Sequence, residues 1–537
     1  MSGRANLETF FTPKSIAVIG ASNDPRRVGY AIFKNLLDGK QKVFAVNDAE
    51  KEVLGRISYA SITDVPDKVD LALLAIRARF VPEALSQCAR VGIGNVIVVS
   101  AGFKEEGEEG VALEKRLAVI AQKNNLQVLG PNCLGVINLH SGLNASFAAG
   151  IPRAGGISFL SQSGAMGTAM LDWACMEGVG ISKFVSLGNE AVTNELPFLE
   201  YFAQDKNTSA LLCYFENISD GPQFLELARK VAAKKPLVVL RAGRSARGAS
   251  AVSSHTGSLA PNDAVFSAAI RQAGGIVVAS LRELLSLAKL FQLGVYRPLQ
   301  RLAILTNGGG PSVVAADQVE LSHSLSLATL SDTTKESLKK TLPPMAAVGN
   351  PVDVIGDALS DRFASALKTL SADRGVEGII AIVTPQLMTE MEKTAVVFME
   401  SHKKKPVLPV FMGGELADVG RATLQRKGFA NFDFPSDVIT ALDQLATGNK
   451  KPEQRSADPK KDVKPQVLRL LPFLQTQKLL SEYKLPSCGV LVKNSRELAS
   501  AWEDIKGPAV LKVVSPDIIH KSEARVVAVG VKTLAEA

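Results

Sequence analysis

One unit recurs along most of the chain: a short apolar run, a loop of small residues, and a stretch with apolar residues three and four positions apart. In the first part of the chain these runs lie at residues 15–20, 42–47, 70–76, 95–100 and 126–130. Because each run is apolar on both faces, we expect parallel strands in the middle of a sheet that helices cover on both sides. The pattern predicts an α/β protein of the doubly wound kind.

Two further series of the same unit follow, so the 537 residues are expected to fold as several domains. We predict α/β domains over residues 1–140, 150–295 and 296–447. Residues 448–465 are dense in Lys, Pro and polar side chains and lack apolar periodicity, which predicts a solvated linker. Residues 466–537 contain a helix-like stretch and short strands, and we expect them to be the beginning of a further domain.

Composition narrows the class of protein. With 46% hydrophobic and 21% charged residues the chain is ordinary for a globular protein, and it has neither an apolar run long enough for a membrane span nor a signal-peptide core. Its net charge of +8 comes from 61 basic and 53 acidic residues without an aromatic-rich basic stripe, so we expect no nucleic-acid partner. The five cysteines lack metal-binding spacing and are odd in number, which fits a reducing cytoplasm.

Each predicted domain has a loop of small residues between a strand and a helix, at 20–29 (GASNDPRRVG), 161–165 (SQSGA) and 306–311 (TNGGGP). Backbone amides at such helix starts suit a phosphate, although a turn or a helix cap without a ligand remains open for each loop. The first loop lacks the GxGxxG spacing of dinucleotide binding, and the second strand ends in Asn47 rather than an acidic residue. Nicotinamide binding is therefore disfavoured.

One histidine lies in a segment that is too rich in Gly, Ala and Ser to form a core, residues 241–259 (RAGRSARGASAVSSHTGSL). The ordinary interpretation of His255 is a solvated residue on a loop. The alternative is a nucleophile, because an imidazole nitrogen can accept a phosphoryl group when a carboxylate holds the other nitrogen. Glu216, which follows the predicted strand at 210–215, is the candidate carboxylate, and the sequence alone leaves their contact open.

Seven short motifs occur along the chain in a fixed order: IGAS, GPNCLG, SQSGA, FEN, SSHTG, TNGGGP and NPVD. In this order they resemble the ADP-forming acyl-CoA synthetases, the family of archaeal acetyl-CoA synthetases related to succinyl-CoA synthetase. The resemblance covers essentially the whole chain. It implies a Rossmann-like CoA-binding domain, two flavodoxin-like domains of the succinyl-CoA synthetase type, and the start of an ATP-grasp domain.

The resemblance also implies roles for single residues. Coenzyme A would bind along the first loop and the next strand ends, at Gly20, Ala21, Ser22, Pro25, Val28, Gly29, Asn47 and Ile76. Relatives usually continue Ile76 with proline, whereas this chain has Arg77. Phosphate and the thioester would be held by Asn132, Cys133, Ser161, Ser163, Gly164, Gly188, Asn189, Gly308, Gly309 and Gly310. Cys133 would be a loop residue and not a nucleophile.

The implied reaction interconverts acyl-CoA, ADP and phosphate with a free acid, coenzyme A and ATP, through an acyl phosphate and a phosphohistidine, with Mg²⁺. His255 would be phosphorylated, Glu216 would orient its imidazole, and Lys512 would contact the phosphates of the nucleotide. Residues 523–526 (EARV) replace a glycine pair of relatives. Metal ligands are not specified.

Because the tail matches only the start of an ATP-grasp domain, we expect full turnover to need an ATP-grasp chain in a hetero-oligomer, or a homo-oligomer of this chain. A CoA-binding regulatory homologue without complete turnover is the alternative. A nicotinamide oxidoreductase would rest on the first glycine loop alone. The motifs specify neither the acyl group nor a preference for ADP over GDP.

Overall fold

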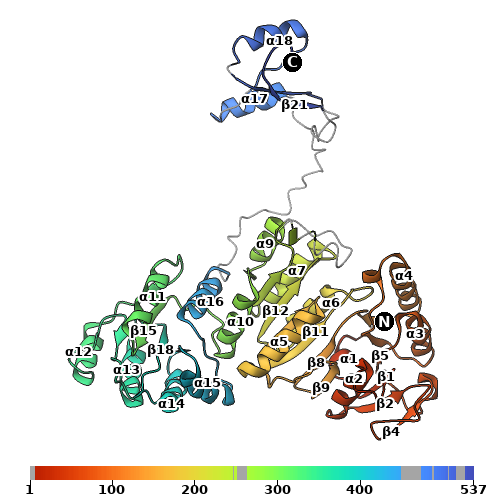
Figure 1. The fold of residues 1–537 in the computed structure, drawn as a ribbon, viewed down its shortest axis with the longest axis horizontal. Coiled ribbons are helices and arrows are strands. Elements are labelled where there is room, and N and C mark those ends of the chain that lie inside the picture. Colours follow the sequence, from red (N-terminus) through yellow and green to blue (C-terminus); the bar gives the residue numbers. More distant parts are fainter. Residues whose placement is uncertain are drawn as a thin grey trace. The chain divides into compact units, whose positions relative to one another are not determined.

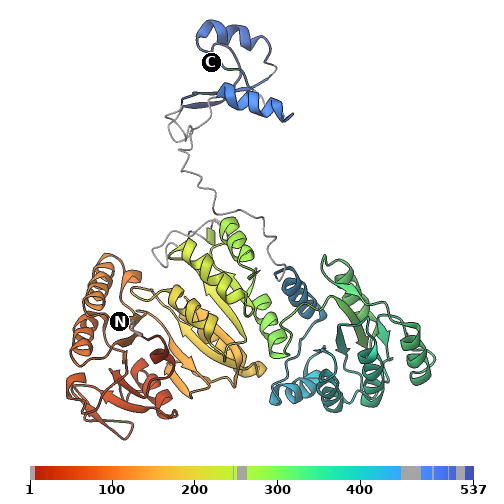
Figure 2. The same ribbon diagram turned by 180° about the vertical axis from the view of Figure 1, so that it is seen from behind.

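A computed structural model describes residues 6–245, 247–248, 250, 263–448, 473–485, 489–505, 507–515 and 526–537. The chain divides into two compact units, residues 1–453 and 454–537, and each is described by itself. The first unit contains three sheets with helices on both faces (Figures 1 and 2). This arrangement confirms the predicted α/β class.

The first sheet has seven strands in the order β3-β4-β2-β1-β5-β6-β7. Its strands are β1 (Ser15–Ile19), β2 (Lys42–Val46), β3 (Glu52–Val53), β4 (Arg56–Tyr59), β5 (Leu71–Leu74), β6 (Asn95–Val98) and β7 (Gln127–Leu129). All pairs are parallel except β3 with β4. Ile16 and Val18 pack in one buried cluster and Ala17 and Ile19 in another, so β1 is covered on both faces. The covering helices are α2 (Val28–Leu37), α3 (Val81–Arg90) and α4 (Glu108–Lys123).

The second sheet also has seven strands, in the order β14-β13-β12-β10-β11-β8-β9. They are β8 (Gly135–Asn138), β9 (Leu143–Ser146), β10 (Ala154–Ser161), β11 (Ile181–Ser186), β12 (Ala210–Phe215), β13 (Leu237–Arg241) and β14 (Ile276–Val278). Its helices are α5 (Gly164–Glu177), α6 (Glu195–Gln204), α7 (Gly221–Ala232), α9 (Asp263–Gln272) and α10 (Leu281–Gln292). The antiparallel pairing of β8 with β11 joins residues before 140, predicted to belong to the first domain, to the second sheet.

The third sheet follows the order β16-β15-β18-β19, and β17 pairs with β15. Its strands are β15 (Arg301–Thr306), β16 (Ser326–Leu327), β17 (Val352–Asp353), β18 (Gly378–Val383) and β19 (Val407–Phe411). Its helices are α11 (Gly309–Glu320), α12 (Asp332–Thr341), α13 (Ser360–Ala372), α14 (Met391–His402), α15 (Glu415–Arg426) and α16 (Pro435–Gly448). The last of these, α16, packs against α10 of the preceding series, and Leu287 and Leu442 belong to one buried cluster.

The second unit contains α17 (Phe473–Glu482), α18 (Ser495–Trp502) and the antiparallel strands β20 (Ala509–Lys512) and β21 (Val527–Val531). Lys512 is exposed at the end of β20.

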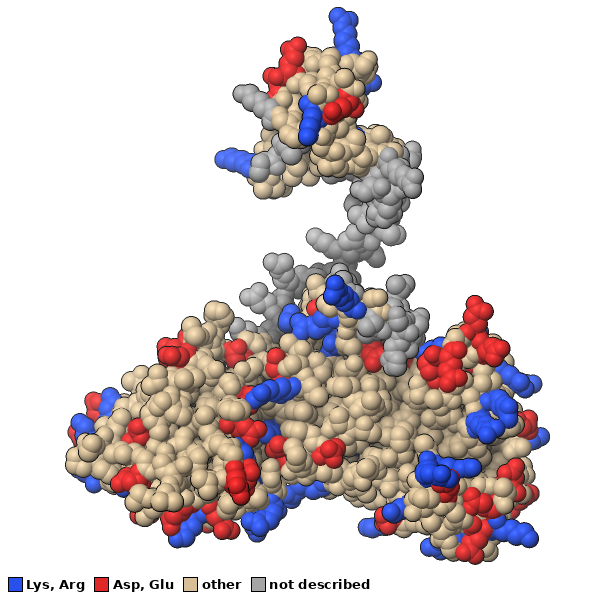
Figure 3. Space-filling model, viewed as in Figure 1, with Lys and Arg blue, Asp and Glu red and all other residues tan. Residues whose placement is uncertain are grey.

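Over the described part of the face in Figure 3, acidic and basic side chains are interspersed. Among the described residues, no helix combines the length and the apolar character needed to cross a bilayer.

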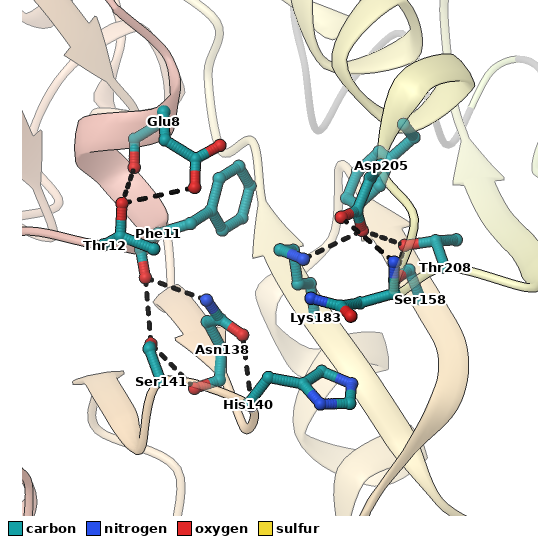
Figure 4. Close-up of polar contacts among 12 residues, drawn as sticks. Glu8, Phe11, Thr12, Asn138, His140, Ser141, Ser158, Lys183, Asp205 and Thr208 are labelled. Carbon is teal, nitrogen blue, oxygen red and sulfur yellow. Dashed lines mark hydrogen bonds and ion pairs between the residues drawn. The ribbon is translucent and has the colours of Figure 1, made fainter.

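A buried ion pair connects β11 with the end of α6. Lys183 Nζ lies 2.8 Å from Asp205 Oδ2, and the two side chains are 2% and 8% exposed (Figure 4). Asp205 also accepts a hydrogen bond from Thr208. The ammonium group of Lys183 lies over the rings of Phe11 and Tyr201, each at 5.8 Å. Phe11 ends the short helix α1 (Glu8–Phe11), so this cluster fixes the amino-terminal residues on the second sheet.

We expect Asp205→Ala to lower the free energy of unfolding by about 3–5 kcal/mol, because it leaves the charge of Lys183 buried and unpaired. Denaturation of the full chain by urea measures the loss. The matched control is Lys230→Ala, which removes the exposed pair with Glu226 and should leave the free energy of unfolding nearly unchanged. Equal losses in the two variants would contradict the prediction.

The same pair predicts acid sensitivity. Burial alone would raise the pKa of Asp205, but hydrogen bonds from Lys183 and Thr208 outweigh burial and lower the pKa. A carboxyl group with a lowered folded-state pKa stabilises the fold above its unfolded-state pKa, and this contribution is lost as the pH falls through the folded-state pKa.

Candidate active site

A cavity of about 410 Å³, here called the inner cavity, lies where β10, β11 and β12 end and meet the loop after β7. This is the position at which doubly wound sheets hold their ligands. Seven predicted site residues line it: Asn132, Cys133, Ser163, Gly164, Gly188, Asn189 and Glu216. Segments more than 80 positions apart in the sequence therefore contribute to a single cavity.

One wall of the inner cavity is the start of α5. Ser163 caps the helix by accepting a hydrogen bond from the backbone N–H of Met166 at 3.3 Å. Ser161 does not line the cavity but supports the loop, because its hydroxyl donates to the backbone oxygen of Ser163 at 2.8 Å. Gly164 and Ala165 line the cavity at the amino end of the helix, where backbone N–H groups are unpaired within the helix and carry a partial positive charge. The wall suits a phosphate.

Gln162, which directly precedes the N-cap of α5, connects two of the strand ends around the cavity. Its amide nitrogen donates to Glu190 Oε2 at 2.9 Å and to Asn217 Oδ1 at 3.0 Å, and its amide oxygen accepts from the backbone N–H of Glu216 at 2.5 Å. Gln162 thus holds the residues that follow β11 and β12 in register with each other. Gln162 was not predicted as a site residue from the sequence, although it lies inside the SQSGA motif.

Glu190 is a second carboxyl group in the cavity that the sequence analysis missed. Its backbone has a φ of 58°, a conformation that is costly for a residue with a side chain. Burial, followed by the neighbouring charge of Glu195, raises the pKa of Glu190 to about 8, and a hydrogen bond from Gln162 opposes the shift. The only sequence signal was its place directly after Gly188 and Asn189.

Cys133 lines the inner cavity as a neutral thiol. Burial raises its pKa to about 12, and its Sγ lies 3.4 Å from the backbone oxygen of Val98, to which it donates. Because the thiolate is the nucleophilic form of cysteine, this environment favours a structural role for Cys133.

Asn189 ties the inner cavity to the first sheet's domain. Its amide nitrogen donates to Glu105 Oε2 at 2.6 Å and to Glu114 Oε2 at 2.8 Å, and its backbone oxygen accepts from Lys104 Nζ at 2.6 Å. Asn132 adds a longer contact from its amide nitrogen to Asn189 Oδ1 at 3.4 Å. Lys104 also lines the cavity and supplies a positive charge there.

A second, larger cavity of about 1070 Å³, the outer cavity, lies at the carboxyl ends of the strands of the first sheet. Six residues predicted to bind coenzyme A line it: Gly20, Ser22, Val28, Gly29, Asn47 and Ile76. Ala21 and Pro25 are not part of its lining, and the backbone oxygen of Ala21 accepts a hydrogen bond from Asn47 Nδ2 at 2.7 Å.

The glycines of the first loop are required by close packing. A Cβ atom on Gly29 would lie 1.9 Å from the backbone oxygen of Gly20, and one on Gly20 would lie 2.4 Å from that of Ala75. Gly20 also has a φ of 95°. The loop therefore folds back against its own helix and leaves the strand ends open to a ligand.

The two cavities meet. Val99, Asn132 and Phe147 line both of them, so these three residues form a wall that the two cavities share. Arg27, Arg77 and Arg79 line the outer cavity, together with Asp24, Asp48, Glu50 and Glu83. Arg27 Nε lies 3.7 Å from Asp24 Oδ2, so Arg77 and Arg79 are the better placed of the three arginines to meet an anionic ligand.

His255 lies outside the described residues, but the ends of its segment are described. Arg241, which ends β13, is buried, and its Nη1 lies 3.1 Å from Oδ1 of Asp263, the first residue of α9. Arg241 pairs with Phe215 in the sheet, and Phe215 directly precedes Glu216. The segment that carries His255 therefore starts and ends beside the strand that leads to Glu216.

Two predicted groups lie elsewhere. Gly308, Gly309 and Gly310 lie at the start of α11 in the third sheet's domain and do not line either cavity. Lys512 belongs to the second unit. Within the described ranges there is no group of three or more His, Cys, Asp or Glu side chains placed to hold a metal ion.

Three family models match the chain. A CoA binding domain matches residues 14–138, a succinyl-CoA ligase-like flavodoxin domain matches 154–291, and an ATP-grasp domain matches 463–537. The first two matches include the strands whose ends form the outer and inner cavities.

The chain is 40% identical to the ADP-forming acetate–CoA ligase I of Archaeoglobus fulgidus over 533 residues, which cover 96% of this chain and 76% of that protein. It is 41% identical to the alpha subunit of the ADP-forming acetate–CoA ligase II of Pyrococcus furiosus, over 81% of this chain and 96% of the subunit. A solved structure of the dinucleotide forming acetyl-coenzyme A synthetase 1 of Candidatus Korarchaeum cryptofilum, in complex with phosphate and ADP, matches with a TM-score of 0.77 and 31% identity. It covers 83% of this chain and 98% of that one.

Proposed function

The chain belongs to the family of ADP-forming acetate–CoA ligases, and on that premise we propose that it interconverts acyl-CoA, ADP and phosphate with a free acid, coenzyme A and ATP. The observation that carries the proposal is the junction of the two cavities at Val99, Asn132 and Phe147. The larger cavity, with Arg77 and Arg79 in its lining, thus adjoins one that combines a helix start with buried carboxyl groups.

In this proposal coenzyme A occupies the outer cavity, with its phosphates near Arg27, Arg77 and Arg79 and its thioester at the junction. Phosphate binds at the start of α5, near the amides of Gly164 and Ala165. It attacks the thioester carbonyl, which gives an acyl phosphate and free coenzyme A. Positioning and charge stabilisation by preorganised amides supply most of the catalysis.

The acyl phosphate then transfers its phosphoryl group to His255, while Glu216 orients the imidazole. The ends of the His255 segment lie beside the strand that leads to Glu216, which supports this step. The phosphohistidine passes the phosphoryl group to ADP at an ATP-grasp site, where Lys512 contacts the nucleotide phosphates. Mg²⁺ enters with the nucleotide, because proteins commonly bind this ion through substrate phosphates and one or two carboxylates.

The Pyrococcus furiosus relative is an alpha subunit, and this chain covers 96% of it. We therefore propose that the chain works in an oligomer with an ATP-grasp chain. A CoA-binding regulator without turnover is disfavoured, since relatives up to 41% identical are ligases and both cavities are formed in this chain.

The proposal predicts a phosphorylated intermediate. Incubating the protein with acetyl-CoA, radiolabelled phosphate and Mg²⁺ should place on it a phosphoryl group that is labile to acid and stable to base, as expected for phosphohistidine. Adding ADP together with a separately expressed ATP-grasp chain should then move the label to ATP. If the unaltered chain takes up no labelled phosphate in the presence of any of several acyl-CoA thioesters, the ligase reaction is excluded.

A further inference from the structure

Glu190 is the least explained charged group in the inner cavity. Gln162 donates to its Oε2, whereas its Oε1 is shielded from solvent and accepts no hydrogen bond from the residues that the structure describes. A buried carboxylate oxygen without a donor is costly, and a strained backbone φ of 58° holds it there. Strain and an unsatisfied polar atom together at a cavity wall are typical of a functional group.

Three charged groups act on Glu190. Glu195 at the start of α6 and Glu216 at the end of β12 contribute negative charge, and Lys104 contributes positive charge. Glu105 and Glu114 face the neighbouring Asn189 and not Glu190. Burial and Glu195 dominate, so the pKa of Glu190 is raised to about 8 and its carboxyl group holds a proton at neutral pH.

Resting on the proposed function, we propose that Glu190 is the proton donor that converts the departing sulfur of coenzyme A into a thiol. Val99, Asn132 and Phe147 line both cavities, so the thioester of coenzyme A in the outer cavity would lie at this shared wall, and Glu190 lines the inner cavity. A proton donor is most effective when its affinity for the proton is close to that of the group it serves, and thiols have a pKa near 8.5.

The step balances without another reactant. An oxygen of hydrogen phosphate attacks the carbonyl carbon, the C–S bond breaks, and its electron pair goes to sulfur. The carboxyl group of Glu190 gives its proton to that sulfur. The proton left on the bound phosphate then passes to the Glu190 carboxylate, which restores the starting state. In the reverse direction the carboxylate accepts the proton of the coenzyme A thiol.

Arsenate isolates this step, because an acyl arsenate hydrolyses spontaneously and the release of thiol from acetyl-CoA then reports only on thioester cleavage. We expect Glu190→Gln, which keeps the size of the side chain but cannot transfer a proton, to slow thiol release by roughly 10²- to 10⁴-fold. Glu190→Asp, which retains a carboxyl group, should recover part of the rate. Phosphorylation of the same variants by radiolabelled acetyl phosphate bypasses the thioester and should change by less than about 3-fold.

The pH profile separates proton transfer from a structural role. Thiol release by the unaltered protein should fall above about pH 8, as Glu190 loses its proton. Glu195→Gln is the matched control, since Glu195 is a buried neighbour that lies outside the cavity lining and accepts from Ser219. Removing its charge should move the alkaline limb to lower pH and leave the maximal rate within about 3-fold.

Equal losses of both reactions in Glu190→Gln, or an unchanged pH profile, would overturn the role of Glu190. A different result tests the premise. If the unaltered protein neither releases thiol in the presence of arsenate nor takes label from acetyl phosphate, the proposed function itself fails.

Discussion

Replacing His255 with alanine should abolish the phosphoryl label on the protein and reduce ATP formation from acetyl-CoA below detection. The variant lacks the nitrogen that is proposed to accept the phosphoryl group, and no histidine among the described residues lines the inner cavity. Arsenate-dependent release of thiol should persist, because that step precedes the histidine. Acid lability of the label and its loss in the variant are measured on gels after incubation with labelled phosphate.

His402→Ala provides the control for this experiment. His402 lies on α14 in the third sheet's domain, where its ring nitrogens contact the backbone oxygens of Val407 and Leu293. The variant should keep the label even if the fold is weakened. A label that persists in His255→Ala, or that disappears equally in both variants, would refute His255 as the acceptor.

Replacing Glu216 with glutamine should slow phosphorylation of the protein by acetyl phosphate by on the order of 10³- to 10⁴-fold. An imidazole that loses its orienting carboxylate adopts the wrong tautomer, and a comparable exchange in a catalytic triad has a similar cost. The backbone N–H of Glu216 would still donate to Gln162, so the cavity should keep its shape. Rapid-quench measurement of the label gives the rate.

The Glu216 and Glu190 variants should impair different steps of the proposed reaction. Glu216→Gln should leave arsenate-dependent thiol release nearly unchanged, whereas Glu190→Gln should impair it. If both variants impair both reactions to the same extent, Glu190 and Glu216 do not have the separate roles proposed for them. Such an outcome would indicate that Gln162 couples them into a single structural unit.

Most of the fold could be predicted from the sequence, because runs such as residues 15–20 and 95–100 are apolar on both faces and so specify central parallel strands. β8 and β9 were missed. They are only four residues long each and pair with each other in antiparallel fashion, and β11, the other partner of β8, lies over 40 positions along the chain. The packing of α16 on α10 is a tertiary contact that periodicity cannot reveal.

Residues of the two cavity linings could be predicted where the sequence pattern is local. The loops at Gly20 and Ser163 have a glycine or capping pattern that the backbone itself requires, and the structure places them at the two cavities. Gln162 and Glu190 were missed because their roles depend on which strand ends meet. Gly308 has the same local pattern, yet the fold places it in another domain.

The ion pair between Arg241 and Asp263 limits how far the imidazole of His255 can lie from Asp263. It fixes both ends of the segment that carries His255, and His255 precedes Asp263 by only eight residues. A fully extended chain spans at most about 3.5 Å per residue, so the tether confines the imidazole to within roughly 28 Å of that anchor, whatever path the segment takes. Within this radius the nucleophile has a high local concentration, and beyond it the concentration is zero. In the proposed reaction, the nucleotide must therefore be brought within this radius of Asp263.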